Sequence, residues 1–398
     1  MKKRNIFLHI GIEKTGTTSI QEFLYENRDR LSDKGYHFIQ SPGNKNNRAL
    51  ASYTMADHKF DDYFRDLNLI TIEKKEEHNK ETAQKFQKEI SNLSDSINSI
   101  IISSEHFHSR IDSKKEITKL KSLLTPFYSN IKIICYLREQ SETCTSLFST
   151  SIKSGSPNDF SYLTEQCNIN NTYYNYKKML ENWSEVFGKE NIIVRVFDKS
   201  QLINNDLITD FLYILNINPT SGLTREKSAQ NESLNDIGQA LGLSINKTIN
   251  NSIKTEKTKE DKAKLLSTIS KNFKGKGITL SKENYKRIYN EFKESNREVN
   301  EKYLNNTSCL FKYKEPIQKT SKVDFDSIYE IIHQLYNSNN LPDHYADLFR
   351  DTALLYEKND IKKALLFMEL AEGIRPSGGF IKKKIIEYKG INIRNNKK

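Results

Sequence analysis

Residues 7–20, FLHIGIEKTGTTSI, place a lysine, two glycines and several hydroxyl side chains after a short apolar run. Backbone amides at the start of a helix after Gly16 can bind an anion, because free N–H donors and the helix dipole both favour negative charge. A nucleotide-triphosphatase loop has its lysine directly after the second glycine, whereas Lys14 precedes Gly16 by two residues. The loop therefore predicts an anion site of another kind, although a plain strand–turn–helix connection fits equally well. The hydroxyls available there are Thr17, Thr18 and Ser19.

A second anion site is predicted where another apolar run ends. In IKIICYLREQSETCTSLF, a strand over 131–137 leads into Arg138, and Ser146 follows eight residues later. If a helix begins near Ser141, Ser146 lies on its early turns and faces back toward Arg138. A guanidinium and a hydroxyl that converge in this way form a good phosphate site. The alternative is a surface arginine and a serine packed within a helix.

Candidate proton acceptors follow a third apolar run, in SIIISSEHFHS. Glu105, His106 and His108 follow this predicted strand, and α/β proteins bind ligands at the carboxyl ends of their parallel strands. Each side chain could accept a proton from a reacting hydroxyl, and an imidazole has the ordinary pKa nearer to neutral pH. The structural alternative for Glu105 or His106 is a helix cap or a buried core histidine.

Other residues with chemical potential have commoner structural roles. His9 lies inside the first predicted strand and is expected in the core, and Arg195, at the end of a strand, most often forms a salt bridge. A group of aromatic residues at helical spacing is likewise expected in the core and outside the site: Tyr173, Tyr174, Tyr176 and Trp183.

The elements that must position the candidate residues alternate along the first 220 residues. Apolar, β-branched runs of strand length are separated by amphipathic segments, which predicts an α/β fold with a P-loop-type parallel sheet flanked by helices. Residues 43–79 are polar and aromatic with little periodicity, and we expect an insertion there that covers the site. After the first strand, the predicted strands are 99–103, 131–137 and 191–197, and the predicted helices are 17–34, 80–93, 114–124, 142–152, 173–187 and 207–215.

The C-terminal third predicts a separate helical extension. From 228 to about 304 the sequence is helical and polar, and a linker over 314–323 follows, so we expect a main domain at 1–313 and an α-helical extension at 324–398. Residues 345–378 resemble a single tetratricopeptide-type helix pair. One such pair cannot bury its own apolar face, so it should pack on the main domain or on a partner protein. The residues at the spacing of that motif are Ala364, Ala371 and Pro376.

The overall composition limits the class of protein more than its chemistry. The chain has 398 residues, a net charge of +11 and four cysteines without zinc-type spacing, and its apolar runs are shorter than the roughly 20 residues of a membrane helix. We expect a cytoplasmic protein that binds neither metal nor nucleic acid. The tail from 381 to 398 carries seven Lys or Arg against Glu387. Any membrane contact would therefore be peripheral and made by this basic tail.

Together, the KTGTTS loop and the strand-Arg-x7-Ser pattern resemble the two motifs of sulfotransferases that use 3′-phosphoadenosine 5′-phosphosulfate (PAPS). In that family the first motif binds the 5′-phosphosulfate and the second binds the 3′-phosphate. The likeness to bacterial, carbohydrate-directed members extends from Asn5 to about Leu304, with looser matches at RVFDKSQL (195–202) and QNESLN (230–235). The residues that it assigns to the PAPS site are Lys14, Thr15, Gly16, Thr17, Thr18, Ser19, Arg138 and Ser146.

The resemblance implies sulfuryl transfer to a hydroxyl of a carbohydrate or glycolipid, with 3′-phosphoadenosine 5′-phosphate (PAP) as product and no metal. Lys14 would stabilise the leaving group, and Glu105 is favoured over His106 as the base because some carbohydrate-directed members have a carboxylate there. Two alternatives from other classes remain open. One is a P-loop kinase or nucleotidase, which the position of Lys14 disfavours. The other is a non-catalytic protein that binds a partner through its C-terminal helices.

Overall fold

The computed structural model describes residues 2–219, 222–225, 233–250, 256–314 and 344–395. The chain forms two compact units that interleave along the sequence. The first unit comprises residues 1–143, 167–229 and 286–314, and the second comprises 144–166, 230–285 and 315–398, as far as each is described. The predicted linker and the start of the extension lie outside the described residues, so the division at 313 and 324 stays a prediction.

The first unit is built on a five-stranded sheet in the order β2-β3-β1-β4-β5, in which every pair of neighbouring strands is parallel. The fold predicted from the sequence is thus confirmed. The three-residue strand β2 was not predicted, because so short an edge strand carries no periodicity of its own. The strands are β1 (Arg4–Gly11), β2 (Tyr36–Phe38), β3 (Ser99–Ser103), β4 (Tyr128–Leu137) and β5 (Ile192–Val196).

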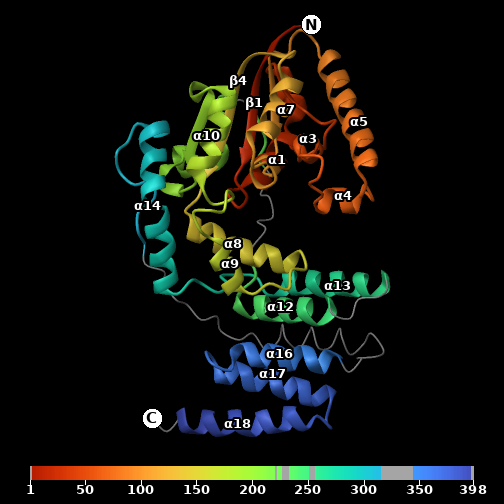
Figure 1. The fold of residues 1–398 in the computed structure, drawn as a ribbon, viewed down its shortest axis with the longest axis vertical. Coiled ribbons are helices and arrows are strands. Elements are labelled where there is room, and N and C mark those ends of the chain that lie inside the picture. Colours follow the sequence, from red (N-terminus) through yellow and green to blue (C-terminus); the bar gives the residue numbers. More distant parts are fainter. Residues whose placement is uncertain (1, 220–221, 226–232, 251–255, 315–343, 396–398) are drawn as a thin grey trace. The chain divides into compact units, whose positions relative to one another are not determined.

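Helices cover both faces of this sheet, and β1 at its centre is buried on both sides (Figure 1). Alternate side chains of β1 enter two apolar clusters: Ile6 and Leu8 pack with α7 and α10, whereas Phe7 packs with α1 and α11. The continuous apolar sequence of β1 follows from this two-sided burial. The helices are α1 (Thr17–Glu26), α2 (Arg28–Asp33), α3 (Arg48–Thr54), α4 (Asp62–Asp66), α5 (Ile72–Ser91), α6 (His106–Ser109), α7 (Lys114–Leu124), α10 (Tyr176–Phe187) and α11 (Leu207–Ile214).

Two helical predictions in this unit were wrong in detail. The expected helix over 17–34 is divided into α1 and α2 at Asn27, whose side-chain amide donates to the carbonyls of Phe23 and Thr224, each at 2.9 Å. The expected irregular insertion over 43–79 is largely helical, since it contains α3, α4 and the first turns of α5. Short helices held by tertiary contacts give too weak a periodic pattern to be found from sequence.

The second unit is helical in the residues described. One apolar cluster joins α12, α13, α16, α17 and α18, and within it Ala364 and Ala371 of the predicted tetratricopeptide-like pair are fully buried. That pair, α16 and α17, packs on α12, as a single pair requires. The helices are α8 (Gln140–Lys153, from Cys144 onward), α9 (Phe160–Gln166), α12 (Asp236–Asn250), α13 (Glu256–Asn272), α16 (His344–Tyr356), α17 (Ile361–Ile374) and α18 (Gly379–Asn395), while α14 (Lys282–Leu304) lies mainly in the first unit.

A buried ion pair crosses the second unit. Lys363 Nζ of α17 lies 2.8 Å from Asp236 Oδ2 of α12, and the hydroxyl of Tyr356 donates to the Asp236 carbonyl at 2.8 Å. These contacts fix the helix pair to α12. Among the described residues of the chain, no helix is long and apolar enough to cross a membrane.

Candidate functional site

The loop between β1 and α1 has the backbone of an anion-binding turn. Lys14 and Gly16 both have positive φ, 69° and 76°, and Thr15 between them does not. Such alternation turns successive N–H groups toward one point. The positive φ of Gly16 favours glycine, and a Cβ there would also displace the end of the Leu207 side chain. Gly16 also provides no side-chain cap for α1, which leaves the first-turn amides of this helix to another acceptor.

The hydroxyl side chains of the loop are not equivalent. Thr15 is fully buried and its Oγ1 donates to the Ile12 carbonyl at 2.6 Å, so any contact of Thr15 with a ligand would come from its backbone amide. Thr17 is also buried, whereas Thr18 is exposed and Ser19 is half-buried. The structure therefore favours Thr18 and Ser19 as hydroxyl donors among the residues predicted for this role.

Arg138 joins the second predicted motif to the first. Its Nη1 donates to the Lys14 carbonyl at 3.0 Å, and its Nε lies 3.3 Å from Glu142 Oε2. The guanidinium also lies over the ring of Phe197 and retains about a quarter of its exposure. Ser146 lies on α8, which begins at Gln140, but it belongs to the second unit. Lys14 and Arg138 are thus brought together, and the place of Ser146 beside them stays a prediction.

Glu105 lies where β3 ends, directly beside the end of β1. A Cβ on Gly11 would come within 2.6 Å of Glu105 Cα, so this glycine permits the close approach of the two segments. Glu105 Oε2 accepts hydrogen bonds from Gln21 Nε2 at 2.8 Å and from Asn46 Nδ2 at 3.0 Å. The carboxylate is therefore held in place by two neutral amide side chains.

His106 is the neighbour of Glu105 at the start of α6. Its Nε2 lies 3.8 Å from Glu105 Oε1. Burial lowers the pKa of His106, the charge of Arg48 and more weakly that of Arg110 lower it further, and Glu105 and Glu13 oppose the shift. The imidazole is consequently neutral at neutral pH, the state in which it can accept a proton.

Two arginines beside this pair converge on one carboxylate. Arg48 forms an ion pair with Asp61, and Arg110 Nε donates to Asp61 Oδ2 at 3.1 Å. Arg110 also reaches Asp62 Oδ1 at 3.3 Å. The predicted insertion thus contributes Asn46, which donates to Glu105, and Arg48, whose charge acts on His106, while its covering of a site stays a prediction.

The residues expected to be structural largely have that role. His9 is buried, its Nδ1 lies 2.9 Å from Ser103 Oγ, and burial lowers its pKa to about 3. Arg195 forms a two-pronged ion pair with the fully buried Asp210. Trp183 is fully buried as predicted, but Tyr173 is not confined to the core, because its hydroxyl donates to Glu13 Oε2 at 2.9 Å.

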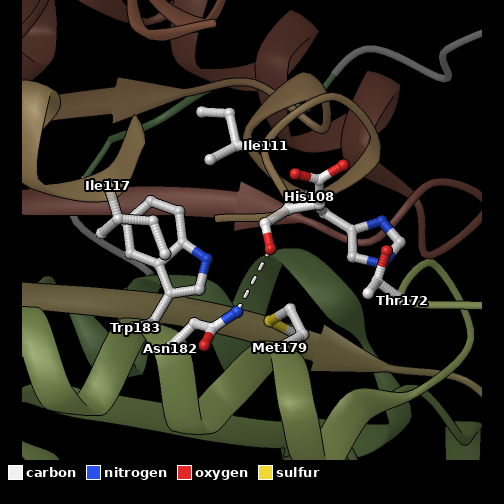
Figure 2. Close-up of a pocket in the computed structure, with 8 residues that line it drawn as sticks. His108, Ile111, Ile117, Thr172, Met179, Asn182 and Trp183 are labelled. Carbon is white, nitrogen blue, oxygen red and sulfur yellow. Dashed lines mark hydrogen bonds between the residues drawn. The ribbon is translucent and has the colours of Figure 1, made fainter. Parts of the chain in front are cut away.

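A small pocket is lined by His108 and Trp183. Figure 2 shows Met179 and Asn182 among the residues that line it, with Asn182 Nδ2 donating to the Asp112 carbonyl at 3.3 Å. The space holds about one water molecule. This pocket is too small for a nucleotide.

Several site residues were missed by reasoning from sequence. All but Glu13, which directly precedes Lys14, reach the site through a tertiary contact, and the polar composition of the segment around residue 46 was a local signal. They are Glu13, Gln21, Asn46, Arg48, Arg110 and Tyr173.

Comparison with known proteins agrees with the motifs. The model of the sulfotransferase domain family matches residues 4–199. An uncharacterized protein of Archaeoglobus fulgidus is 26% identical over 309 residues, which cover 69% of this chain and 81% of that protein. The crystal structure of a sulfotransferase from Alicyclobacillus acidocaldarius is similar with a TM-score of 0.37 and 14% identity, covering 57% of this chain and 88% of the other. The family model spans the Lys14 loop, Glu105 and the strand end at Arg138, so residues 4–199 of this chain are similar to the sulfotransferase domain.

Proposed function

We propose that the protein transfers a sulfuryl group from PAPS to a hydroxyl of a carbohydrate or glycolipid. The observation that carries the proposal is the 3.0 Å hydrogen bond from Arg138 Nη1 to the Lys14 carbonyl, which joins the two predicted phosphate sites. PAPS has an anionic group at each end of its ribose, and two adjoining donor sites suit it. The alternating turn at 14–16, the uncapped start of α1 and the Arg138 guanidinium, which is one quarter exposed, all offer donors to anions.

Each residue has a defined part in the proposed reaction. The acceptor oxygen forms a bond to sulfur while the bond from sulfur to the 5′-phosphate oxygen breaks, and PAP leaves. Lys14 stabilises the negative charge that develops on that phosphate oxygen, and the α1 amides with Thr18 and Ser19 hold the phosphate. Arg138 holds the 3′-phosphate, with Ser146 as its proposed partner. Catalysis by these residues is positioning and electrostatics.

We propose Glu105 as the base that takes the acceptor proton. Both amide hydrogen bonds to its carboxylate go to Oε2, and Oε1 faces the neutral imidazole of His106 at 3.8 Å. His106 would then share or relay the proton, which is consistent with its lowered pKa. The amide groups around Glu105 are also suited to hydrogen bonds with sugar hydroxyls, which supports a carbohydrate acceptor.

Ligand-induced thermal stabilisation tests the choice of donor. We expect PAP to raise the melting temperature by several degrees and ATP with Mg²⁺ to have little effect. The Arg138→Ala variant should lose most of the PAP effect, because a charge-assisted hydrogen bond is worth about 2 kcal/mol. Arg297→Ala is the matched control, since Arg297 pairs with Glu294 on the exposed face of α14.

Stabilisation by ATP with Mg²⁺ alone would instead favour the kinase or nucleotidase alternative. Stabilisation by neither ligand would favour a non-catalytic role. Once PAP binding is established, a sulfate-transfer screen with labelled PAPS over neutral, acidic and amino-containing saccharides and glycolipids should identify the acceptor. Transfer to none of these acceptors would contradict the carbohydrate proposal while leaving PAPS as donor.

A further inference from the structure

Glu13 precedes Lys14 in the loop and is tied to a residue 160 positions further along the chain. The hydroxyl of Tyr173 donates to Glu13 Oε2 at 2.9 Å. A hydrogen bond to a charged group is stronger than one between neutral groups. The hydrogen bond to Tyr173 therefore holds the Lys14 loop at Glu13, and Tyr173 belongs to neither of the two predicted motifs.

Tyr173 is itself held firmly against α6. Its carbonyl lies 2.9 Å from His108 Nε2, and its ring packs on the His108 imidazole with 4.6 Å between centroids. Its backbone N–H donates to Asn171 Oδ1 at 3.1 Å. These contacts fix the backbone, ring and hydroxyl of Tyr173 together. Tyr173 therefore connects His108 to Glu13 through a well-fixed side chain.

Tyr173 connects the residues proposed to act on the sulfuryl donor with those proposed to act on the acceptor. His108 lies on the short helix α6, which starts at His106 directly after Glu105. Glu13 is the residue next to Lys14. The path from Lys14 through Glu13, Tyr173 and His108 thus links the group that would act on the donor to the groups that would take the acceptor proton.

We infer that Glu13 and Tyr173 are positioning residues of the sulfuryl transfer, whose hydrogen bond sets the place of Lys14 relative to Glu105 and His106. The inference rests on the proposed function. Near-attack geometry is sensitive to displacements of about 1 Å, so loss of the bond should slow the chemical step more than it weakens donor binding. Donor binding depends instead on the α1 amides and Arg138.

Glu13 also contributes charge to the surroundings of His106. The charged groups that face His106 are Glu13 from the loop, Glu105 and Arg110 from either side of α6, and Arg48 from α3. The two carboxylates raise the pKa of the imidazole, while burial and the two arginines lower it. Replacing Glu13 by a neutral residue should therefore lower the pKa of His106 further.

The hydrogen bond is tested by Tyr173→Phe, Glu13→Ala and the double variant. We expect each single change to lower kcat by about tenfold, with the KM for PAPS and the stabilisation by PAP within about twofold of wild type. The double variant should be no slower than the slower single variant, because both changes remove one interaction. Tyr303→Phe is the matched control: it removes the 2.8 Å hydrogen bond between the hydroxyls of Tyr303 and Ser184 elsewhere in the first unit, and kcat should not change.

The charge is tested separately by Glu13→Gln, which keeps an oxygen that can accept the Tyr173 hydroxyl. This variant should retain kcat within about threefold at its optimum, and the acidic limb of its kcat–pH profile should move to lower pH. Multiplicative losses in the double variant, an unchanged kcat in Tyr173→Phe, or a loss of PAP stabilisation as large as the loss of kcat would overturn the inference. Those results would leave the proposed function intact, because wild-type transfer and PAP binding test it independently.

Discussion

Lys363 in the second unit and Glu105 in the first are both charged side chains with little exposure, yet their surroundings differ. Lys363 is 4% exposed and lies against a carboxylate, Asp236 Oδ2, at 2.8 Å. Glu105 is 18% exposed and is held by the neutral amides of Gln21 and Asn46, with His106 at 3.8 Å. The Lys363–Asp236 ion pair therefore has a structural role. Glu105, which is held by neutral amides, is the better candidate for a catalytic role.

The same contrast separates two arginines at the ends of neighbouring strands. Arg195 on β5 binds the fully buried Asp210 through both Nε and Nη2 of its guanidinium. Arg138 after β4 has a backbone carbonyl and the half-exposed Glu142 as its partners. Position at a strand end therefore does not identify a ligand-binding arginine. Arg138, whose carboxylate partner is half-exposed, is the arginine that we propose for the ligand.

Lys14→Ala gives the largest effect that this comparison predicts. The lysine would act on charge that develops only in the transition state, so we expect kcat to fall by about a thousandfold. The melting temperature should stay within a few degrees of wild type, because Lys14 is only half-buried in a loop. A sulfate-transfer assay with PAPS at saturating acceptor, together with a thermal melt, measures both.

Lys132→Ala is the control for this change. Lys132 lies in β4 of the same unit, and its Nζ donates to the Glu190 carbonyl at 2.9 Å. It should lose some stability and keep its turnover. Wild-type turnover by Lys14→Ala would remove Lys14 from the mechanism and would place the chemistry elsewhere along the sheet edge.

The fold could be predicted from sequence where burial imposes a regular pattern. The run IIIS in β3 and the run before Arg138 are apolar because both faces of those strands are covered, and strand ends then follow in register. The Lys14 loop was also predictable, since its glycine and hydroxyl spacing is local. Arg138 lies beside Lys14 because β1 and β4 are adjacent and parallel, and this strand order could not be predicted from the sequence.

The rest of the site depends on contacts that no local pattern encodes. From its spacing, Tyr173 was predicted to be a core aromatic residue. Its hydroxyl contacts Glu13 because of the path that the chain takes before α10. Asn46 reaches Glu105 from a segment whose short helices leave little periodicity. Partners of this kind are set by tertiary packing, which a single sequence does not show.

Lys363→Met should give the next largest effect, on stability alone. It leaves Asp236 as an uncompensated buried carboxylate, and breaking a buried pair costs about 3 kcal/mol. Trp183, the one tryptophan of the chain, lies in the core of the first unit, so its fluorescence reports that unit. In urea unfolding followed by circular dichroism, we expect the transition of the second unit to occur at a lower urea concentration. The fluorescence midpoint of the first unit and the thermal stabilisation by PAP should not change.

The double variant Lys363→Met with Asp236→Leu is the matched test of this reasoning. Replacing both partners by apolar residues should recover most of the lost stability, since a buried pair contributes little net free energy. An equal shift of the fluorescence and dichroism transitions in Lys363→Met would show that the two units unfold together, and the separation of roles between them would then fail.

Acid should lower the free energy of unfolding of the first unit because its buried histidines take up protons on unfolding. We expect this effect to be smaller than that of Lys363→Met. Burial lowers the pKa of His9 to about 3, whereas the unfolded imidazole keeps its ordinary value of about 6.5. Between these values the unfolded chain binds a proton that the folded chain does not, so the free energy of unfolding falls as the pH decreases, by about 1.4 kcal/mol per pH unit. Urea titrations at pH 7, 6 and 5, followed by Trp183 fluorescence, should show that His9→Asn reduces this slope and that the same change at exposed His58 does not. Equal slopes in wild type and His9→Asn would mean that His9 is protonated in the folded protein, and acid sensitivity would then no longer distinguish the first unit.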